Sequence, residues 1–365
     1  MIKKFILNCI LGFIYIITYA FKIEENKITF ISYKSNKLEG NFKLINKYLA
    51  KENKYNLNYI LMKYENSFSG NIKYLFNCMK QVYYINTSKV ILLDYNNYVV
   101  SNFKKDGVKV IQVWHATGAV KKFGNDIKRD YKIKNYDYIL ATSEEWKKPY
   151  STAFNVDESD VIVTGLPQSD ILFSEKKMGE YKKYMLNKYP KIQGKKVVLF
   201  APTFRGDPIK DARYKEIDID YIKESLGDEY AFIYKLHPSL GERRISNDKN
   251  IINANSESIT KLFSVTDYLI TDYSSIVFDF SILNKPIILF APDLEEYKKD
   301  RGMYIDYESS MPGPICKSEE EVVSVIEKDE FSKEIIYDFM DTYFKYKDNN
   351  STKRVGEFIK NLMNC

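Results

Sequence analysis

TDYLITDYSSIVFDFSILNKPIILF, residues 266 to 290, is the stretch of sequence that decides the fold. A short β-prone run at residues 268–271 precedes the turn Asp272-Tyr273-Ser274-Ser275. Apolar residues then recur at 276, 277, 280 and 283, the period of a helix that lies with one face on a sheet. Residues 286–290 give a second strand that looks buried. The stretch therefore predicts a strand, turn, helix and strand, which is half of a nucleotide-binding fold.

The polar residues of this turn have two interpretations. The hydroxyls of Ser274 and Ser275 suit a helix N-cap, but they also stand beside backbone N–H groups at the positive end of a helix dipole, where an anion binds. Asp279, about one helical turn further on, either binds ribose hydroxyls or occupies a favourable place near the helix start. The residues alone leave both interpretations open.

Composition narrows the class of protein. A chain of 365 residues is long enough for two domains, and 45% hydrophobic with 28% charged residues is typical of a globular protein. The net charge of +6 is small for this length, and the sequence contains no block of like charge of the kind that binds nucleic acid. Nucleic acid is therefore not expected as a partner. The four cysteines show no CxxC spacing, which fits a reducing cytosol and inert thiols.

Several common site motifs are missing from the sequence. With two histidines, no HExxH and no CxxC pair, a zinc site is not expected. The chain has no GxxxxGK[ST] phosphate loop and no GxGxxG fingerprint, which argues against ATP hydrolysis and dinucleotide oxidoreduction. It has no GxSxG elbow either. We expect neither a metal nor a cofactor.

The first 25 residues hold an apolar segment. Residues 5–21 are uncharged and as a helix would cover about 25 Å, a little short of the hydrocarbon core of a bilayer. A weakly polar stripe (Asn8, Gly12, Tyr15, Tyr19) between Lys4 and Lys22 fits a helix lying in the membrane interface. A core helix and a secretory signal are the alternatives. We expect a membrane-associating segment, spanning or lying on the membrane, and a peripheral protein on the cytoplasmic side of the cell membrane.

Short apolar runs alternate with amphipathic segments from residue 26 onward, which predicts α/β structure with doubly wound, mainly parallel sheets. The strands expected in a first series are 28–32, 57–62, 82–85, 90–93, 108–113, 138–142 and 161–164, and those of a second series are 197–201, 232–236, 251–253, 269–271 and 287–290. A lysine-rich helix at 174–188 joins the series, and a last helix is expected at 352–363. We therefore expect two Rossmann-like domains, 26–175 and 176–365, facing across a cleft as in the glycosyltransferase-B architecture, with ligands at the carboxyl ends of strands.

The only two histidines of the sequence, His115 and His237, each follow an expected strand directly. A neutral imidazole can take a proton from an alcohol, as attack on phosphorus or on a sugar requires. Thr117 and Gly118 add a hydroxyl and a backbone that a ligand can approach closely, and two lysines follow them. A solvated basic turn is the alternative interpretation of that loop, and structural histidines are the alternative to catalytic ones.

A second polar group follows the strand at 197–201. Thr203 and Arg205 offer a hydroxyl and a guanidinium suited to phosphate oxygens. Arg205 could equally be an ion-pair partner. Lys235 stands two residues before His237.

Six motifs in unbroken order carry a resemblance to a known family. They are WHATGAVKKFG (114–124), TGLPQSD (164–170), APTFR (201–205), KLHP (235–238), ITDYSSIVFDF (270–280) and PDLEEYKKDRGMYIDYESSMPGPI (292–315). Together they resemble the CDP-glycerol glycerophosphotransferase family, the teichoic acid primases and polymerases, whose relatives include enzymes that use CDP-ribitol. Six ordered motifs are far more specific than any one of them.

The resemblance implies an enzyme that moves glycerol phosphate, or a related polyol phosphate, from CDP-glycerol to a hydroxyl of a lipid-linked envelope polymer or its linkage unit, releasing CMP. The acceptor would be a prenyl-linked saccharide or polyol phosphate at the membrane surface. By motif position, His115 is the base and Ala116, Thr117, Gly118 and Ala119 form a loop that contacts the donor. The other positions that resemble the family's CDP-glycerol site are Pro202, Thr203, Lys235, Leu236, His237, Ser274, Ser275 and Asp279.

Two departures from the family pattern leave the substrates open. Gln168 stands where the family usually has arginine, so one charged contact to the donor is weaker or comes from another residue. The first motif carries Ala116, Gly118 and Ala119 in its variable places. Glycerol or ribitol as the polyol, and primase or polymerase as the activity, therefore remain alternatives. A nucleotide-sugar glycosyltransferase, a sugar epimerase and a non-catalytic nucleotide-binding scaffold are the other functions compatible with the architecture.

Overall fold

The computed structural model describes residues 2–206, 212–241 and 243–364, so Met1 and Cys365, the outermost residues of the expected domains, lie outside it. The chain forms two compact units. Unit 1 comprises Met1–Ala116, Phe123–Asp170 and Phe344–Cys365, and unit 2 comprises Thr117–Lys122 and Ile171–Tyr343. This division differs from the expected boundary near residue 175 in two segments: the C-terminal one belongs to unit 1, and Thr117–Lys122 belongs to unit 2.

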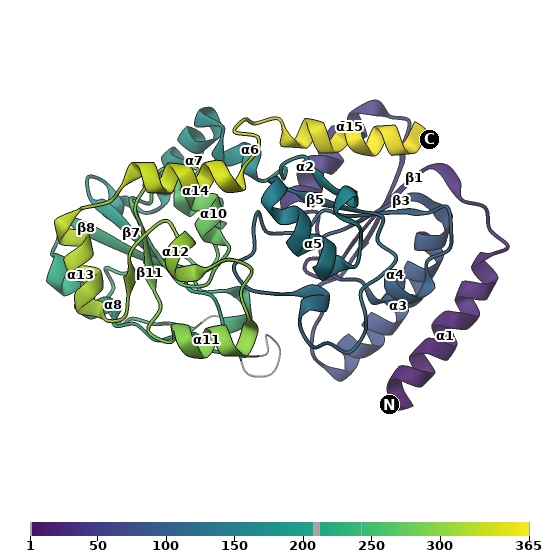
Figure 1. Ribbon diagram of the computed structural model, residues 1–365, viewed down its shortest axis with the longest axis horizontal. Coiled ribbons are helices and arrows are strands. Elements are labelled where there is room, and N and C mark those ends of the chain that lie inside the picture. Colours follow the sequence, from purple (N-terminus) through teal and green to yellow (C-terminus); the bar gives the residue numbers. More distant parts are fainter. Residues whose placement is uncertain (1, 207–211, 242, 365) are drawn as a thin grey trace. The chain divides into compact units, whose positions relative to one another are not determined.

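Unit 1 is built on a parallel six-stranded sheet with the order β2-β1-β3-β4-β5-β6. Figure 1 labels β1, β3 and β5 of this sheet. Its apolar strands are largely buried, as expected for a sheet covered on both faces. The strands are β1 (Glu24–Ser32), β2 (Asn56–Leu61), β3 (Ser88–Leu93), β4 (Lys109–Gln112), β5 (Tyr138–Ala141) and β6 (Val161–Val163), and the helices are α1 (Ile2–Thr18), α2 (Gly40–Leu49), α3 (Phe68–Thr87), α4 (Tyr98–Phe103), α5 (Lys147–Phe154) and α15 (Ser351–Asn364), with α6 (Ser169–Leu172) at the crossing into unit 2.

Unit 2 holds a second parallel six-stranded sheet, with the order β12-β11-β10-β7-β8-β9. The strand, turn, helix and strand predicted from residues 266–290 are β10, α10 and β11, and Leu269 pairs with Ile287. The strands are β7 (Lys196–Phe200), β8 (Tyr230–Tyr234), β9 (Ile252–Asn253), β10 (Tyr268–Thr271), β11 (Ile287–Phe290) and β12 (Ile315–Cys316), and the helices are α7 (Glu175–Lys188), α8 (Ile219–Leu226), α9 (Ile259–Phe263), α10 (Ile276–Ser281), α11 (Leu294–Arg301), α12 (Tyr307–Ser310), α13 (Glu319–Lys328) and α14 (Lys333–Tyr343).

The strand expected at residues 82–85 is wrong, because these residues form the last turns of α3. Cys78, Val82 and Ile85 are fully buried and follow the i, i+4, i+7 spacing of a helix. The β-branched and aromatic residues 82–85 favour a strand, but the burial of one helical face determines their structure. Strand β12, only two residues long, was missed.

Helix α15 explains why the C-terminal segment belongs to unit 1. Val355, Ile359 and Met363 pack into the same core as the apolar face of α2. The Asp170 carboxylate accepts hydrogen bonds from the backbone N–H groups of Ser351 (2.7 Å) and Thr352 (2.8 Å), so a residue distant in sequence satisfies the start of the helix.

Helix α1 packs against α3 and α4, and two residues of its polar stripe, Asn8 and Tyr15, contact the protein, whereas Tyr19 is exposed. Tyr98 donates a hydrogen bond to Asn8, the Tyr15 hydroxyl donates to the backbone oxygen of Lys104 at 3.3 Å, and the Tyr15 ring meets Phe103 edge-on. Most of the exposed side chains at positions 5–18 are apolar, including Phe5, Phe13 and Ile16, and Asn8 is exposed among them. Among the residues that the structure describes, no helix has both the length and the apolar character to cross a membrane.

Candidate active site

The end of β4 turns sharply at Trp114, directly before His115. Trp114 has φ 62°, in the left-handed region that bulky residues seldom adopt. Its backbone is held on both sides: its N–H donates to the Gln112 side chain at 3.1 Å, and its carbonyl accepts from the Asn41 amide at 3.2 Å. Local strain maintained by the surrounding structure is a common feature of functional sites.

The hydrogen bonding of His115 sets its tautomer. Nδ1 of His115 lies 3.0 Å from the main-chain oxygen of Asp94, and a carbonyl oxygen can only accept. The proton of the neutral ring is therefore on Nδ1, and Nε2 carries the lone pair. The Tyr95 ring stacks on the imidazole with centroids 4.3 Å apart and planes 10° apart, which fixes its orientation. His115 is thus arranged as a base at Nε2.

His237 has the opposite arrangement. It precedes a short 3₁₀ helix, Pro238–Leu240, and its Nδ1 accepts a hydrogen bond from the Ser239 N–H at 3.1 Å. In the neutral ring Nε2 therefore carries the proton. The Phe204 ring lies 4.6 Å from the imidazole. This tautomer presents an N–H donor at Nε2, which suits contact with an anion.

The segment Thr117–Lys122 joins unit 2 through an antiparallel bridge. Lys122 N donates to Gly302 O and Tyr304 N donates to Val120 O, both at 3.0 Å. At the other end of the segment, the Thr117 hydroxyl donates to Asp279 of α10 at 3.0 Å. Burial raises the pKa of Asp279 to about 7, although the Thr117 hydrogen bond acts in the opposite direction. The bridge joins the first family motif to the last.

Lys121 is the functional candidate that motif matching left unassigned. Its ammonium donates to the Thr203 hydroxyl at 3.3 Å and to the Tyr297 hydroxyl at 3.4 Å. Burial lowers its pKa to about 8. The Asp272 carboxylate acts to raise this pKa, and the positive charges of Arg301 and Arg205 act to lower it. A partly desolvated cation beside a hydroxyl is a good partner for phosphate oxygens. Its burial, which the sequence does not reveal, is what distinguishes it from Lys122.

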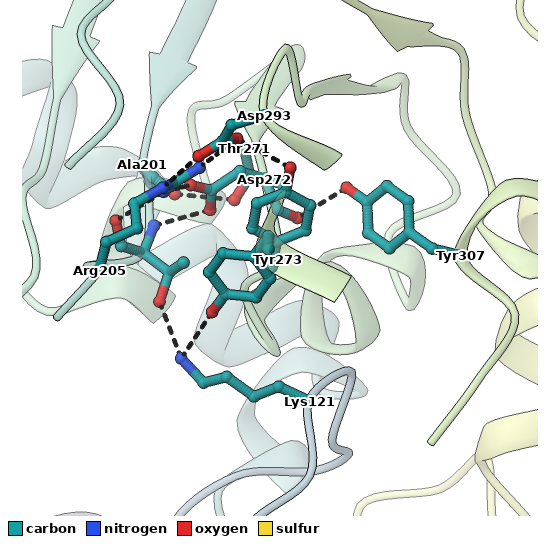
Figure 2. A network of polar contacts seen from close by, with 10 residues as sticks. Lys121, Ala201, Arg205, Thr271, Asp272, Tyr273, Asp293 and Tyr307 are labelled. Atoms are coloured by element: carbon teal, nitrogen blue, oxygen red, sulfur yellow. Dashed lines mark hydrogen bonds and ion pairs between the residues drawn. The ribbon is translucent and has the colours of Figure 1, made fainter. Parts of the chain in front are cut away.

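Arg205 is held by two carboxylates, as Figure 2 shows. Its Nε and Nη2 atoms donate to the two oxygens of Asp293 at 2.9 Å each, and Nη1 donates to Asp272. Asp272 also accepts from the Thr203 N–H at 2.7 Å. In this structure Arg205 has the ion-pair role that the sequence left open, and the network fastens the Pro202-Thr203 loop to the turn after β10.

The serine turn and the Lys235 strand end lie in the same unit. Ser275 is the N-cap of α10 without a side-chain capping bond, and the nearest approach is Ile276 N to the Ser274 hydroxyl at 3.5 Å. The capping interpretation is therefore only weakly supported. Lys235 donates to the Asn255 backbone oxygen at 2.9 Å, and the Leu236 N–H donates to the Asn255 side chain at 2.7 Å.

Gln168 lies in unit 1, near the His115 turn. Its N–H donates to the Asn41 side chain at 2.8 Å, and Asn41 is the residue that also holds the Trp114 carbonyl. The Gln168 side chain packs so closely on Gly40 that a Cβ on that glycine would lie 2.6 Å from its Nε2 atom. The structure thus places His115, Ala116 and Gln168 in unit 1, and the other predicted site residues in unit 2.

A cavity of about 340 Å³ opens beside the Arg205 network in unit 2. Tyr214, Lys215, Tyr297 and Arg301 contribute to its lining, and Arg205 is the only residue predicted from sequence that lines it. Within the described part of the chain, no three His, Cys, Asp or Glu side chains are grouped so that they could hold a metal ion.

Comparison with known families gives one match that spans almost the whole chain. The family model described as CDP-Glycerol:Poly(glycerophosphate) glycerophosphotransferase matches residues 13–361. The chain belongs to this family. The recognition made from the six motifs, and the enzyme class that it implies, are therefore confirmed.

Two curated members of the glycerophosphotransferase family illustrate the range of substrates. The chain is 32% identical over 396 residues to a teichoic acid glycerol-phosphate primase of Bacillus subtilis (strain 168), which covers 99% of both proteins. It is 34% identical over 367 residues to a teichoic acid poly(ribitol-phosphate) polymerase of Bacillus spizizenii, which covers 95% of this chain. The chain spans only 58% of that polymerase.

A solved structure of the wall teichoic acid polymerase TagF shares the fold. The TM-score is 0.74 at 23% identity, covering 94% of this chain and 90% of the TagF chain. The two parallel six-stranded sheets of this chain are consistent with this likeness, so the fold is of the TagF type and glycosyltransferase-B-like. Identity at this level supports the fold and not the substrate.

Proposed function

We propose that the chain transfers glycerol phosphate, or ribitol phosphate, from a CDP-polyol to a hydroxyl of a lipid-linked acceptor in teichoic acid synthesis, releasing CMP. The observation that carries the proposal is the family match over residues 13–361, with both histidines in place and with opposite hydrogen bonding. The acceptor is a prenyl-linked saccharide or polyol phosphate at the membrane surface.

In this mechanism His115 is the general base. Its Nε2 lone pair takes the proton of the acceptor hydroxyl as the oxygen attacks the β-phosphorus, which carries the polyol. The bond from the β-phosphorus to the bridging oxygen breaks, and that oxygen leaves with CMP. The Asp94 carbonyl stabilises the imidazolium that forms, because it accepts a hydrogen bond from Nδ1–H, with 3.0 Å between the nitrogen and the oxygen.

The residues of unit 2 stabilise the leaving group. His237 donates from Nε2 to the charge that grows on CMP, and Lys121 with Thr203 offers an ammonium and a hydroxyl to phosphate oxygens. Ser274 and Ser275 occupy the family's donor positions at the start of α10. Asp279 has Thr117 as its partner in this structure, so we assign it to holding the Thr117 loop as well as to the donor.

Labelled substrates test the proposal. Purified protein is incubated with CDP-glycerol or CDP-ribitol, labelled in the polyol, and with a synthetic prenyl-linked saccharide. We expect label in the lipid product and one CMP released for each polyol phosphate transferred, with His115→Ala as the inactive control. Release of a nucleoside diphosphate from a nucleotide sugar, with no transfer from either CDP-polyol, would contradict it and favour a glycosyltransferase.

The glycerol and ribitol forms of the proposal are separated by the same assay. The glycerol-phosphate primase that aligns over 99% of both chains favours CDP-glycerol, and the ribitol-phosphate polymerase at 34% identity keeps CDP-ribitol as the second candidate. The ratio of kcat/KM for the two donors decides between them.

We further propose that the protein associates with the cytoplasmic side of the cell membrane through α1 and α3. The support is a pair of neighbouring helices with exposed apolar side chains, among them Phe13 (67% exposed) on α1 and Phe68 (84%) on α3. Exposed apolar patches of this kind commonly mark interaction surfaces. Exposed lysines at positions 22, 73 and 80 offer contacts to anionic headgroups.

A further inference from the structure

Three buried polar atoms of unit 1, two of them in the segment 94–96 that contacts His115, have no hydrogen-bond partner among the described residues. They are Oδ1 of Asp94, Oδ1 of Asn96 and Nε of Arg129. Most buried polar groups in native proteins are paired, so each of these atoms calls for an explanation. The Asp94 carboxyl is otherwise hydrogen-bonded with Ser32 and the Arg129 guanidinium with Tyr131, so these three atoms are what remains for a polar ligand to satisfy.

Aromatic rings connect these residues to the base. Tyr95 stacks on His115, and Tyr33 follows with its ring centroid 5.0 Å from that of Tyr95. The Arg129 guanidinium lies 4.5 Å from the ring centroid of Tyr131. Burial raises the pKa of Tyr33, and the charge of Arg129 acts against this rise, which places the guanidinium within electrostatic reach of the Tyr33 hydroxyl.

The row of rings continues to the N-terminal helix. The rings of Tyr131 and Tyr98 meet edge-on at 5.1 Å, and the Tyr98 hydroxyl donates to Asn8 of α1. All of these residues belong to unit 1. The cluster therefore extends from the base to the helix that we propose lies at the membrane.

We propose that Asp94, Arg129 and the rings of Tyr33 and Tyr95 form the acceptor subsite and bind the end of a polyol-phosphate chain. This inference rests on the proposed function and names the part of the acceptor that is recognised. The Asp94 carboxylate accepts a hydrogen bond from a polyol hydroxyl. The Arg129 guanidinium binds the phosphate next to that polyol, and the ring faces pack on its C–H groups.

The chemistry of each partner supports this assignment. A carboxylate oxygen accepts from hydroxyls, and a guanidinium edge is suited to phosphate oxygens. Asp94 also holds His115 through its main-chain oxygen, so one residue orients both the base and the hydroxyl that the base deprotonates. Burial raises the pKa of the Asp94 carboxyl to about 6, although the hydrogen bond with Ser32 and the charge of Lys34 act to lower it. The group is therefore mostly ionised at pH 7.5 and can accept a hydrogen bond from a hydroxyl.

Steady-state kinetics with two acceptors test the subsite. The acceptors are a prenyl-linked saccharide and the same lipid extended by one glycerol phosphate. For Arg129→Gln we expect a KM for the extended acceptor raised by about 10- to 100-fold, the loss typical of a charged hydrogen bond. The KM for CDP-glycerol should stay within twofold. Asp94→Asn keeps the main-chain contact to His115 and should raise the KM of both acceptors, because both present a hydroxyl.

Lys132→Gln is the matched control, because it removes an exposed positive charge three residues from Arg129. It should change neither KM. A second readout is independent of turnover: calorimetric titration of wild-type protein with a short glycerol-phosphate oligomer should show binding that Arg129→Gln weakens and Lys132→Gln leaves intact. Melting temperature and calorimetric affinity for CDP-glycerol establish that each variant is folded.

The outcomes separate this inference from the proposed function. If wild-type protein transfers polyol phosphate but Arg129→Gln keeps the wild-type KM for the extended acceptor, the subsite assignment is wrong. An equal rise for both acceptors in Arg129→Gln also contradicts it, because the guanidinium would then recognise the lipid-linked pyrophosphate that both share. If wild-type protein transfers nothing from either CDP-polyol, the proposed function fails, and loss of oligomer binding in Arg129→Gln would still support the subsite.

Discussion

The Thr117 hydroxyl donates a hydrogen bond to the Asp279 carboxyl at 3.0 Å, although the two residues are 162 positions apart. This contact ties the loop after His115 to the helix that follows the serine turn. Because the carboxyl is buried, its pKa is raised to about 7, and the folded protein holds this proton at pH values where the unfolded chain releases it.

Asp279→Asn is expected to stabilise the protein increasingly as the pH rises. The folded pKa lies above the unfolded value of about 3.9, so the wild-type protein loses stability between about pH 4 and 7 and carries the full cost above pH 7. Asparagine has no such proton to lose and can still accept from Thr117. Urea unfolding should show similar stabilities near pH 4.5 and a gain of at most about 4 kcal/mol at pH 8. Parallel pH profiles for the two proteins would show that Asp279 is not buried as a carboxylic acid.

The two histidines should respond differently to removal. His115→Ala should lower single-turnover rates by about 10²- to 10⁴-fold with donor affinity nearly intact, because the base acts on the acceptor hydroxyl. His237→Ala should weaken both donor affinity and turnover, since an anion contact is lost in ground and transition states alike. Calorimetry beside single-turnover kinetics measures both. The reverse pattern would exchange the two roles, and unchanged rates would make both histidines structural.

Arg205→Met separates pairing from donor binding. The substitution leaves the Asp272 carboxylate buried without its cation, which should cost about 3 to 5 kcal/mol of unfolding free energy. The double variant with Asp272→Asn should recover part of that loss. Chemical denaturation measures both. Wild-type stability with lost CDP-glycerol affinity would instead show that Arg205 serves the donor.

The sequence predicted the parts of the site that depend on local order. The unit β10–α10–β11 was predicted because turn chemistry and hydrophobic period agree within 25 consecutive residues. Both histidines were placed at strand ends for the same reason. The strand expected at 82–85 failed because β-branched residues favour strands, whereas the burial of Cys78, Val82 and Ile85 on one helical face determined the structure.

Long-range contacts account for the features that could not be predicted. Nothing local shows that Asp170 holds the start of α15, or that Lys121 pairs with Met303. Arg205 illustrates the same limit, because its two interpretations differ only in whether Asp272 and Asp293 lie within reach. The orphan atoms of Asp94 and Arg129 are likewise visible only once burial is known.

Gln168→Arg is expected to tighten donor binding by about 1 to 2 kcal/mol if the site is otherwise family-like, because a charge-assisted contact replaces a neutral one. The side chain lies on Gly40, beside the residue that holds the Trp114 carbonyl, so the new guanidinium would lie close to the His115 turn. Calorimetry with CDP-glycerol and CDP-ribitol measures the gain. Unchanged or weaker affinity for both would mean that this branch holds its donor in another way.

The exposed faces of α1 and α3 lead to the prediction about the membrane. Phe68, Ile72 and Phe76 are 84%, 42% and 58% exposed and recur at every fourth residue of α3, so they form one stripe on the helix that α1 packs against. Replacing all three with serine should leave the melting temperature nearly unchanged, because surface side chains contribute little to stability. The same change should strongly reduce flotation with anionic vesicles, because burying each apolar side chain in the membrane would contribute about 1.5 to 3 kcal/mol to the free energy of binding.

The controls for this prediction come from the same chain. Ile335→Ser with Tyr337→Ser removes exposed apolar side chains of α14 in unit 2, which are 56% and 46% exposed, and should leave vesicle binding intact. Deleting Met1 to Ala20 should also release the protein from membranes while CDP-glycerol still binds. That deletion is the less specific test, because it also uncovers Tyr98 and Phe103, which α1 contacts. If the α3 variant binds vesicles as the wild-type protein does, α3 is not a membrane contact. If the truncated protein also stays bound, the membrane surface lies elsewhere on the molecule.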